Sequence, residues 1–383
     1  MTKIKSKILH VAFNGYIFLL ERAYKKLTLD KKKAVLRQIL KSLERYDEDF
    51  LSLRRLPKFA KGFCDRHYFA NTRGGDYAII IRGLLVSEEN FTLETIRIYK
   101  KIFPQVKIII ASWDRPEYRD LYKELENLGC RVLKLAEPDN IGVSHINGQL
   151  TQIKKGIDEA ERLKCKYIII QRSDHRINYP YTIEYLTSLL EAFPVGDNNP
   201  FNQSSRIISV CCFQDRVFEL PPYFLRDLFH FGEVYDLKSF FDVPFTNLTQ
   251  KDYWEALKKS GKDRLTVLEE SELNFAPESL YVKNYIHSVE KIGVKYEDNY
   301  SDWWGLLKNC FLTISPKDID LYGIKHDIKY ILSAPSVQIN NSTYETRNYD
   351  FRKWINIYSD RFEADQSNFE IEDEFQRYWS GLI

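Results

Sequence analysis

Short, fully apolar runs alternate with amphipathic stretches through the first half of the chain. Tyr77–Arg82, Val106–Trp113 and Tyr167–Gln171 are apolar at consecutive positions, a pattern typical of strands buried on both faces of a sheet, and Arg131–Leu135 is a further predicted strand. Helical spacing of apolar residues fills the intervals, at Thr92–Phe103, Tyr118–Leu128 and Ile146–Leu163. This alternation predicts an α/β fold: a Rossmann-like, mostly parallel central sheet with helices on both faces.

The remainder of the chain is less regular. Arg206–Phe213 is predicted to be another strand, and Asp302–Asp327 a strand with irregular flanks. We therefore expect three parts: a basic helical segment over residues 1–75, a main domain over residues 76–335, and a tail over residues 336–383 that packs on the domain.

Charge is distributed unevenly along the 383 residues. The net charge is +2, but residues 1–75 hold 18 Lys and Arg against 7 Asp and Glu, a net +11. Within that segment, residues 30–46 have apolar residues at helical spacing and basic residues elsewhere. Two interpretations stay open: a helix lying on an anionic membrane surface, or a solvated helix packed on the main domain through its apolar stripe.

The overall composition narrows the class of protein. A net charge near zero argues against a dedicated nucleic-acid-binding protein. The apolar run Ile8–Leu20 is shorter than a membrane span and lacks a small-residue cleavage site, so we expect a cytoplasmic protein. The first predicted strand–helix turn, Arg82–Ser87, holds a single glycine, and the P-loop, H-E-x-x-H and G-x-S-x-G motifs do not occur in the sequence.

Residues able to bind a ligand follow the predicted strands, where ligands of open α/β sheets bind. They are Arg82 and Gly83 after the first strand, Trp113 and Asp114 after the second, and Arg172, Asp174 and Arg176 after the fourth. Arginines bind phosphate oxygens, tryptophan stacks on a base or sugar ring, and carboxylates accept from hydroxyl groups or hold a cation. The set suits a nucleoside diphosphate sugar. Burial of Trp113 in the core, or pairing of Arg172 with Asp174, is the structural alternative.

These segments resemble those of a known family. The stretch from YAIIIRG through KIIIASWD to YIIIQRSDHRI is similar to the WavE lipopolysaccharide-synthesis family, bacterial proteins that resemble GT-A glycosyltransferases. Phe224–Leu237 and Ala276–Tyr281 resemble two later segments of the family, so the likeness runs from about residue 77 to 330. Arg82 and Leu84 stand where the family has Gln and Pro, and Gly148 stands in place of an arginine between Asn147 and Gln149.

The resemblance implies a glycosyltransferase that uses a nucleotide-sugar donor and a lipid-linked lipopolysaccharide, O-antigen or capsule acceptor. Such a protein would lie peripherally on the inner face of the bacterial inner membrane. The resemblance adds Asn147 and Gln149 to the donor-binding candidates, and it offers Asp236, Glu278 and Asp227 as catalytic acids. The alternatives are a catalytically inactive carbohydrate-binding or assembly subunit, and a sugar nucleotidyltransferase.

The metal requirement is a separate question. GT-A enzymes commonly hold Mg²⁺ or Mn²⁺ with a D-x-D motif, but the tripeptide here is Arg172-Ser173-Asp174. Asp174 alone is a poor metal site unless substrate phosphates supply most of the ligands. Two alternatives stay open: Asp174 holds Mg²⁺ or Mn²⁺ weakly, or Arg172 itself neutralises the diphosphate and no metal is needed, and the missing first Asp favours the second.

Overall fold

The computed structural model describes residues 22–23, 25–44, 56–62, 75–196, 199–210, 223–252, 255, 277–290, 294–296, 300–324, 336–339, 342–345 and 350–361. The chain divides into two units, Met1–Leu56 and Pro57–Ile383. The first unit contains helix α2 (Leu29–Glu44). Among the described residues, none of the helices combines the length and apolar character that crossing a membrane requires.

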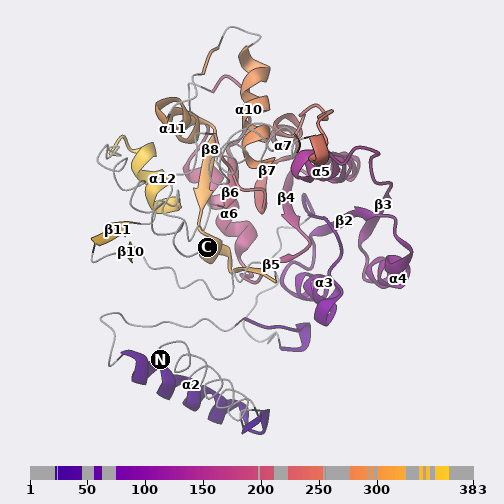
Figure 1. Ribbon diagram of the computed structural model, residues 1–383, viewed down its shortest axis with the longest axis vertical. Helices are drawn as coiled ribbons and strands as arrows, with labels where there is room; N and C mark the ends of the chain where they lie inside the picture. The colour runs from indigo at the N-terminus through magenta and orange to yellow at the C-terminus, as the bar shows by residue number, and fades with distance from the viewer. Residues whose placement is uncertain are drawn as a thin grey trace. The chain divides into compact units, whose positions relative to one another are not determined.

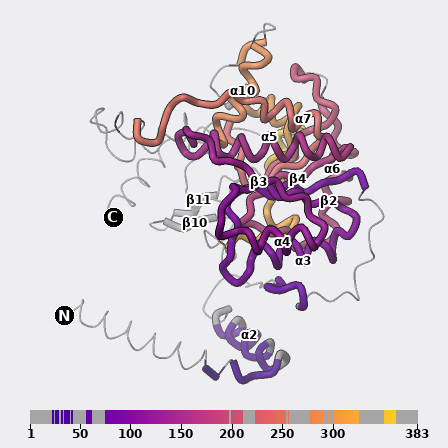
Figure 2. Tube along the Cα trace, turned by 90° about the vertical axis from the view of Figure 1, so that its right-hand side faces the viewer, coloured from indigo at the N-terminus to yellow at the C-terminus, as the bar shows by residue number. Residues whose placement is uncertain are grey.

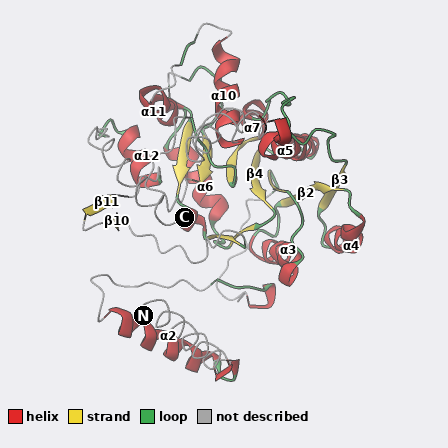
Figure 3. Cartoon of the chain, in the orientation of Figure 1, coloured by secondary structure: helices red, strands yellow, loops and turns green. Residues whose placement is uncertain are grey.

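The second unit is built around a seven-stranded sheet with the order β3-β2-β1-β4-β7-β6-β8 (Figure 3). Its strands are β1 (Tyr77–Arg82), β2 (Lys107–Trp113), β3 (Arg131–Leu135), β4 (Tyr167–Arg172), β6 (Ile207–Val210), β7 (Phe229–Glu233) and β8 (Phe311–Ile314). Two small antiparallel sheets pair β5 (His175–Ile177) with β9 (Leu321–Gly323), and β10 (Ser336–Ile339) with β11 (Ser342–Glu345).

Strand direction in the main sheet determines which residues meet at its edge. Strands β1 to β4 are parallel, whereas β7 is antiparallel to both β4 and β6. The register sets Gln171 near the end of β4 opposite Phe229 at the start of β7. The turn that precedes β7 therefore lies at the carboxyl edge of the parallel strands.

Helices cover both faces of the sheet. Figure 2 shows α5, α7 and α10 on one side and α3 and α4 on the other, and Figure 1 shows the order of the elements along the chain. The helices of this unit are α3 (Phe91–Ile102), α4 (Arg119–Asn127), α5 (Ile146–Arg162), α6 (Thr182–Ala192), α7 (Val234–Phe240), α10 (Pro277–Glu290), α11 (Tyr300–Asn309) and α12 (Phe351–Tyr358). Single 3₁₀ turns lie at Ala60–Gly62, Glu88–Asn90, Pro116–Tyr118, Val143–His145 and Pro316–Ile319.

The sequence explains the central strands and their closest helix. The isoleucine runs of β1, β2 and β4 are almost completely buried, as expected of β-branched residues in strands covered on both faces. Helix α5 packs on β1 and β2, and a Cβ atom at Gly156 would lie 2.5 Å from Ile80 Cγ2. Glycine at position 156 therefore allows the helix to approach the sheet closely.

The α/β prediction with a mostly parallel sheet is confirmed, including β1 to β4. The later prediction over Asp302–Asp327 is corrected in part, because this stretch holds most of helix α11 before β8 begins. The predicted strand Arg206–Phe213 contains β6, and its residues 211–213 lie outside the described part of the chain.

Candidate active site

Two arginines end neighbouring strands at the carboxyl edge of the sheet. Arg82 ends β1 and Arg172 ends β4, and the parallel register sets them opposite each other. The chain order of the strands reverses between β1 and β4, which is the position where open α/β sheets form a ligand crevice. The Arg82 side chain is 5% exposed and that of Arg172 is 26% exposed, so Arg172 is the more accessible to a ligand.

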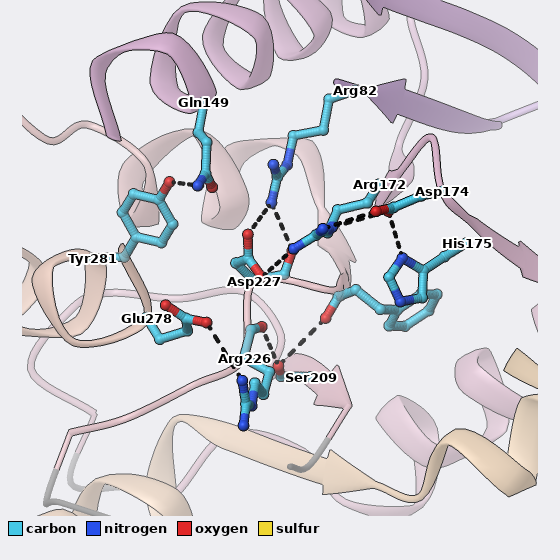
Figure 4. A network of polar contacts seen from close by, with 11 residues as sticks. Arg82, Gln149, Arg172, Asp174, His175, Ser209, Arg226, Asp227, Glu278 and Tyr281 are labelled. Atoms are coloured by element: carbon cyan, nitrogen blue, oxygen red, sulfur yellow. Dashed lines mark hydrogen bonds and ion pairs between the residues drawn. The ribbon is translucent and has the colours of Figure 1, made fainter. Parts of the chain in front are cut away.

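Asp227 lies between these two arginines, in the turn before β7 (Figure 4). Arg82 Nη2 donates to Asp227 Oδ2 over 2.9 Å and to the Asp227 backbone oxygen over 2.6 Å, while Arg172 Nη1 lies 3.6 Å from Oδ1. Burial alone would raise the pKa of Asp227, but the charges of Arg82 and Arg172 lower it to about 2. Asp227 is therefore an ionised counter-ion at neutral pH.

Asp174 holds the other side of Arg172. The guanidinium donates from Nε to Oδ1 over 3.0 Å and from Nη2 to Oδ2 over 2.8 Å, a two-point contact that fixes its plane. His175 Nδ1 lies 2.8 Å from Asp174 Oδ1. Burial opposes ionisation of Asp174, but the hydrogen bonds with His175 and Arg172 hold its pKa well below the usual range.

Glu278 is the acid of this cluster that titrates near neutral pH. It is the second residue of α10, its side chain is 13% exposed, and its Oε1 lies 3.8 Å from Arg226 Nη1. Burial, followed by the negative charge of Asp227, raises the pKa of Glu278 to about 7, although Arg226 and Arg172 oppose the shift. Glu278 is therefore suited to take up and release a proton.

A hydrogen bond joins the helices beside this acid. Tyr281, one turn after Glu278 on α10, donates to Gln149 Oε1 on α5 over 3.1 Å. The cluster thus contains three arginines and three carboxyl groups, with Arg172 and Arg226 each about one quarter exposed. Such a cluster can bind an anion and exchange a proton next to it.

Arg176 and Asn147, two of the predicted donor-binding residues, make contacts elsewhere. Arg176 is 2% exposed and donates to Thr95 Oγ1, the Phe91 backbone oxygen and the Lys58 backbone oxygen, so its guanidinium is directed at α3 and the segment before it. Asn147, at the start of α5, exchanges hydrogen bonds with the Thr246 backbone in both directions. The described contacts of both side chains are those of packing and loop anchoring.

Three further candidates lie at the end of the first two strands. Trp113 is 5% exposed, which matches its core alternative, while Asp114 is exposed. Gly83 has φ +115°, a backbone conformation that favours glycine, and its carbonyl accepts from Ser112 Oγ over 2.8 Å.

Asp236 anchors a loop. Its fully buried carboxylate accepts from the backbone N–H groups of Ser204 and Ser205, each over 2.9 Å, and from Ser205 Oγ over 3.1 Å. Burial raises the pKa of Asp236, although these hydrogen bonds oppose the shift. Among the three acids predicted as catalytic, the structure therefore brings together Asp227 and Glu278.

A protein-family model for WavE lipopolysaccharide synthesis matches residues 81–381, which contain every member of the cluster. The chain belongs to the WavE lipopolysaccharide synthesis family. Among curated proteins, none matches this WavE-family chain.

Solved structures resemble the WavE-family chain only weakly. A cytidylyltransferase from Leptospira borgpetersenii serovar Hardjo-bovis is 11% identical with a TM-score of 0.26, and the match covers 58% of this chain and 97% of that one. HddC from Yersinia pseudotuberculosis, complexed with GMP-PN, is 11% identical with a TM-score of 0.28, covering 56% and 99%. Mannose-1-phosphate geranyltransferase from Thermus thermophilus is 13% identical with a TM-score of 0.24, covering 64% and 70%. Because these scores are low, the fold assignment rests on the sheet itself.

The cluster of the WavE-family chain does not fit a divalent cation. Both oxygens of Asp174 accept from Arg172, and Asp227 is paired with two arginines. Within the described ranges, no group of three or more His, Cys, Asp or Glu side chains is placed to hold a metal ion. A guanidinium thus contacts the carboxylates that a cation would need.

Sequence reasoning missed two members of the cluster, Arg226 and Tyr281. Both lie in segments that the sequence analysis singled out, next to Asp227 and three residues after Glu278. An arginine adjacent to a candidate acid was an available signal for Arg226. No sequence signal pairs Tyr281 with Gln149, because 132 residues separate the partners.

Proposed function

We propose that this WavE-family protein is a glycosyltransferase that moves a sugar from a nucleotide-sugar donor to a lipid-linked lipopolysaccharide, O-antigen or capsule acceptor. The observation that carries the proposal is the cluster at the strand-order reversal, where Arg82 and Arg172 end adjacent strands and Glu278 lies beside them. Family membership supports the link to lipopolysaccharide synthesis.

The arginines suit the donor's diphosphate. The side chains of Arg172 and Arg226 are 26% and 24% exposed against 5% for Arg82, so these two are the more accessible arginines of the cluster. Guanidinium forks bind phosphate oxygens at two points and remain charged at every physiological pH. We assign these two residues to binding the diphosphate and to offsetting the charge that develops on it as the sugar departs.

Glu278 is the proposed base. Asp174 and Asp227 are held by arginines and have lowered pKa values, so they are weak proton acceptors, whereas the pKa of Glu278 is about 7. The acceptor hydroxyl gives its proton to the Glu278 carboxylate while its oxygen forms a bond to the anomeric carbon. The bond from that carbon to the diphosphate oxygen breaks, and the electron pair leaves with the nucleoside diphosphate.

A membrane-surface location of the protein, on the inner face of the bacterial inner membrane, is part of the same proposal. On α2, Leu36 and Ile39 are 40% and 45% exposed, and the basic residues Lys31, Arg37 and Lys41 are exposed on the same helix. Exposed apolar side chains flanked by Lys and Arg favour binding to anionic lipid. A lipid-linked acceptor would be met at that surface.

The test of this function is donor turnover by the full-length protein and by Glu278→Gln, in EDTA, over a panel of nucleotide sugars and with lipid-linked saccharide. The wild-type kcat should rise with pH up to about 7, because the base must be ionised. Glu278→Gln should lose at least about 100-fold in kcat and this pH dependence, yet retain donor binding. Glu290→Gln, an exposed acid on the same helix, is the matched control.

Other products would identify a different function. Formation of a nucleotide sugar from a nucleoside triphosphate and a sugar phosphate would indicate a nucleotidyltransferase. Binding of saccharide without binding of any nucleotide would indicate a carbohydrate-binding subunit. Unchanged kcat and pH dependence in Glu278→Gln would remove Glu278 from the reaction.

A further inference from the structure

Asp227 and Asp174 hold Arg172 with different strength. Asp174 makes two hydrogen bonds to Arg172, of 2.8 and 3.0 Å, which fix the plane of the guanidinium. Asp227 Oδ1 lies 3.6 Å from Arg172 Nη1, beyond good hydrogen-bond distance. The pair of Arg172 with Asp227 is thus charge compensation without a close contact.

Arg82 holds Asp227 in this position. Arg82 Nη2 donates to both the carboxylate and the backbone oxygen of Asp227, and both side chains are 5% exposed. Arg82 Nε is buried and has no hydrogen-bond partner among the described residues. Arg82 thus has an unused donor inside the cluster, and Arg172, with a side chain that is 26% exposed, is the more accessible of the two arginines.

A phosphate group and a carboxylate offer similar acceptors to a guanidinium. In the ligand-free protein Asp174 compensates the charge of Arg172 and Asp227 compensates that of Arg82, so these four side chains carry no net charge. Asp227 supplies the second negative charge from a turn whose backbone is already tied to Arg82. Asp227 Oδ1, which lies 3.6 Å from Arg172 Nη1, is the acceptor that a phosphate oxygen would replace beside this guanidinium.

We propose that Asp227 is an internal counter-ion which a diphosphate displaces from Arg172, so that the site binds diphosphate without a divalent cation. The proposal rests on the proposed function only in taking the donor's diphosphate as the natural anion. Asp174 keeps Arg172 in place during the exchange, and Arg82 keeps the charge of Asp227 compensated. If Asp227 were instead a metal ligand, its removal would weaken diphosphate binding rather than strengthen it.

The experiment is calorimetric titration of the full-length protein with inorganic pyrophosphate and with UDP, GDP and CDP, in EDTA and again in MgCl₂. Wild-type protein should bind pyrophosphate in EDTA. Asp227→Asn removes the competing charge and should bind it at least about tenfold more tightly, which corresponds to about 1.4 kcal/mol. Asp120→Asn, the same change at a side chain that is 95% exposed, is the matched control and should bind as wild type does.

A second variant guards against misfolding of Asp227→Asn, which leaves Arg82 with a weaker partner. Arg172→Gln retains the Arg82–Asp227 pair and should weaken pyrophosphate binding at least about tenfold, with folding checked by thermal unfolding. Binding that requires Mg²⁺, or weaker binding by Asp227→Asn in a folded protein, overturns the proposal.

Failure of the proposed function has a different signature. Pyrophosphate bound as expected with no nucleotide or nucleotide sugar bound would support the counter-ion role and overturn the glycosyltransferase proposal. Binding of nucleotide sugars only in the presence of Mg²⁺ would overturn the counter-ion role and support the glycosyltransferase proposal.

Discussion

His230 should make the protein lose stability in mild acid. The side chain lies in β7, is 1% exposed, and its ring meets the edge of Phe241 with centroids 5.3 Å apart. Neither ring nitrogen has a hydrogen-bond partner among the described residues. Burial, and then the charge of Arg82, lower the pKa of His230 from 6.5 to about 3 against the opposing charge of Asp227.

The size and sign of the effect follow from these two pKa values. The unfolded chain binds a proton at His230 below pH 6.5, whereas the folded protein does not until about pH 3. The stability contributed by neutral His230 is therefore complete above pH 6.5 and is lost as the pH falls toward 3. At pH 5 the loss is about 2 kcal/mol, from about 1.4 kcal/mol per pH unit over roughly 1.5 units.

The assay compares wild-type protein with His230→Leu and His230→Phe by urea unfolding between pH 7.5 and 5. Glu278, with a pKa of about 7, titrates in this pH range in all three proteins, so the difference between proteins reports on the histidine. Relative to wild type, both variants should gain about 2 kcal/mol in free energy of unfolding as the pH falls to 5, whatever their stability at pH 7.5. Parallel curves for the three proteins would refute the burial of a neutral histidine.

Two further changes test other parts of the chain. Arg37→Glu with Lys41→Glu on α2 should weaken binding to anionic vesicles at least about 30-fold in a flotation assay, because each basic side chain contributes about 1 kcal/mol. The control is Lys123→Glu with Lys155→Glu, two exposed lysines of the second unit, and equal binding by both double variants would contradict a membrane role for α2. Gly156→Ala should lower the free energy of unfolding by about 1–3 kcal/mol, because the new Cβ would lie 2.5 Å from Ile80 Cγ2. Gly305→Ala in α11 has open space around it and should raise the free energy of unfolding by about 0.5–1 kcal/mol, so equal urea midpoints for the two variants would contradict the close approach of α5 to β1.

The parts of the fold that sequence predicts well are those whose pattern is local. The isoleucine runs of β1, β2 and β4 are apolar at consecutive positions, so the sequence predicts both that they are strands and that both of their faces are buried. Strand β7 escapes such analysis because FHFGE contains a histidine, a glycine and a glutamate, and it is a strand through its pairing with β4 and β6. Its antiparallel direction relative to β4 and β6 depends on how the whole sheet assembles and cannot be predicted from these five residues.

The same distinction separates the predicted site residues. Arg82 and Arg172 could be found from strand ends alone, since the carboxyl edge of a parallel sheet is set by local pattern. Asp227 and Asp236 could not be told apart from sequence, because both are buried acids in one family-like segment. Their partners decide the difference: backbone N–H groups of Ser204 and Ser205 surround Asp236, whereas Asp227 is held by two arginines from strands 55 and 145 residues away in the chain.

That reversed strand also links the fold to the chemistry. If β7 ran parallel to β4, the turn with Asp227 would lie at the opposite edge of the sheet, and Arg82 would be buried without a carboxylate. Because β7 is antiparallel to β4, the turn before β7 lies at the same edge of the sheet as Arg82 and Arg172, and Arg226 in this segment lies near Glu278. The two properties that the proposed reaction needs, a positive site for diphosphate and an acid with a pKa of about 7, thus depend on the direction of one strand. A change that shifts the register of β7 should alter anion binding and the pKa of Glu278 together.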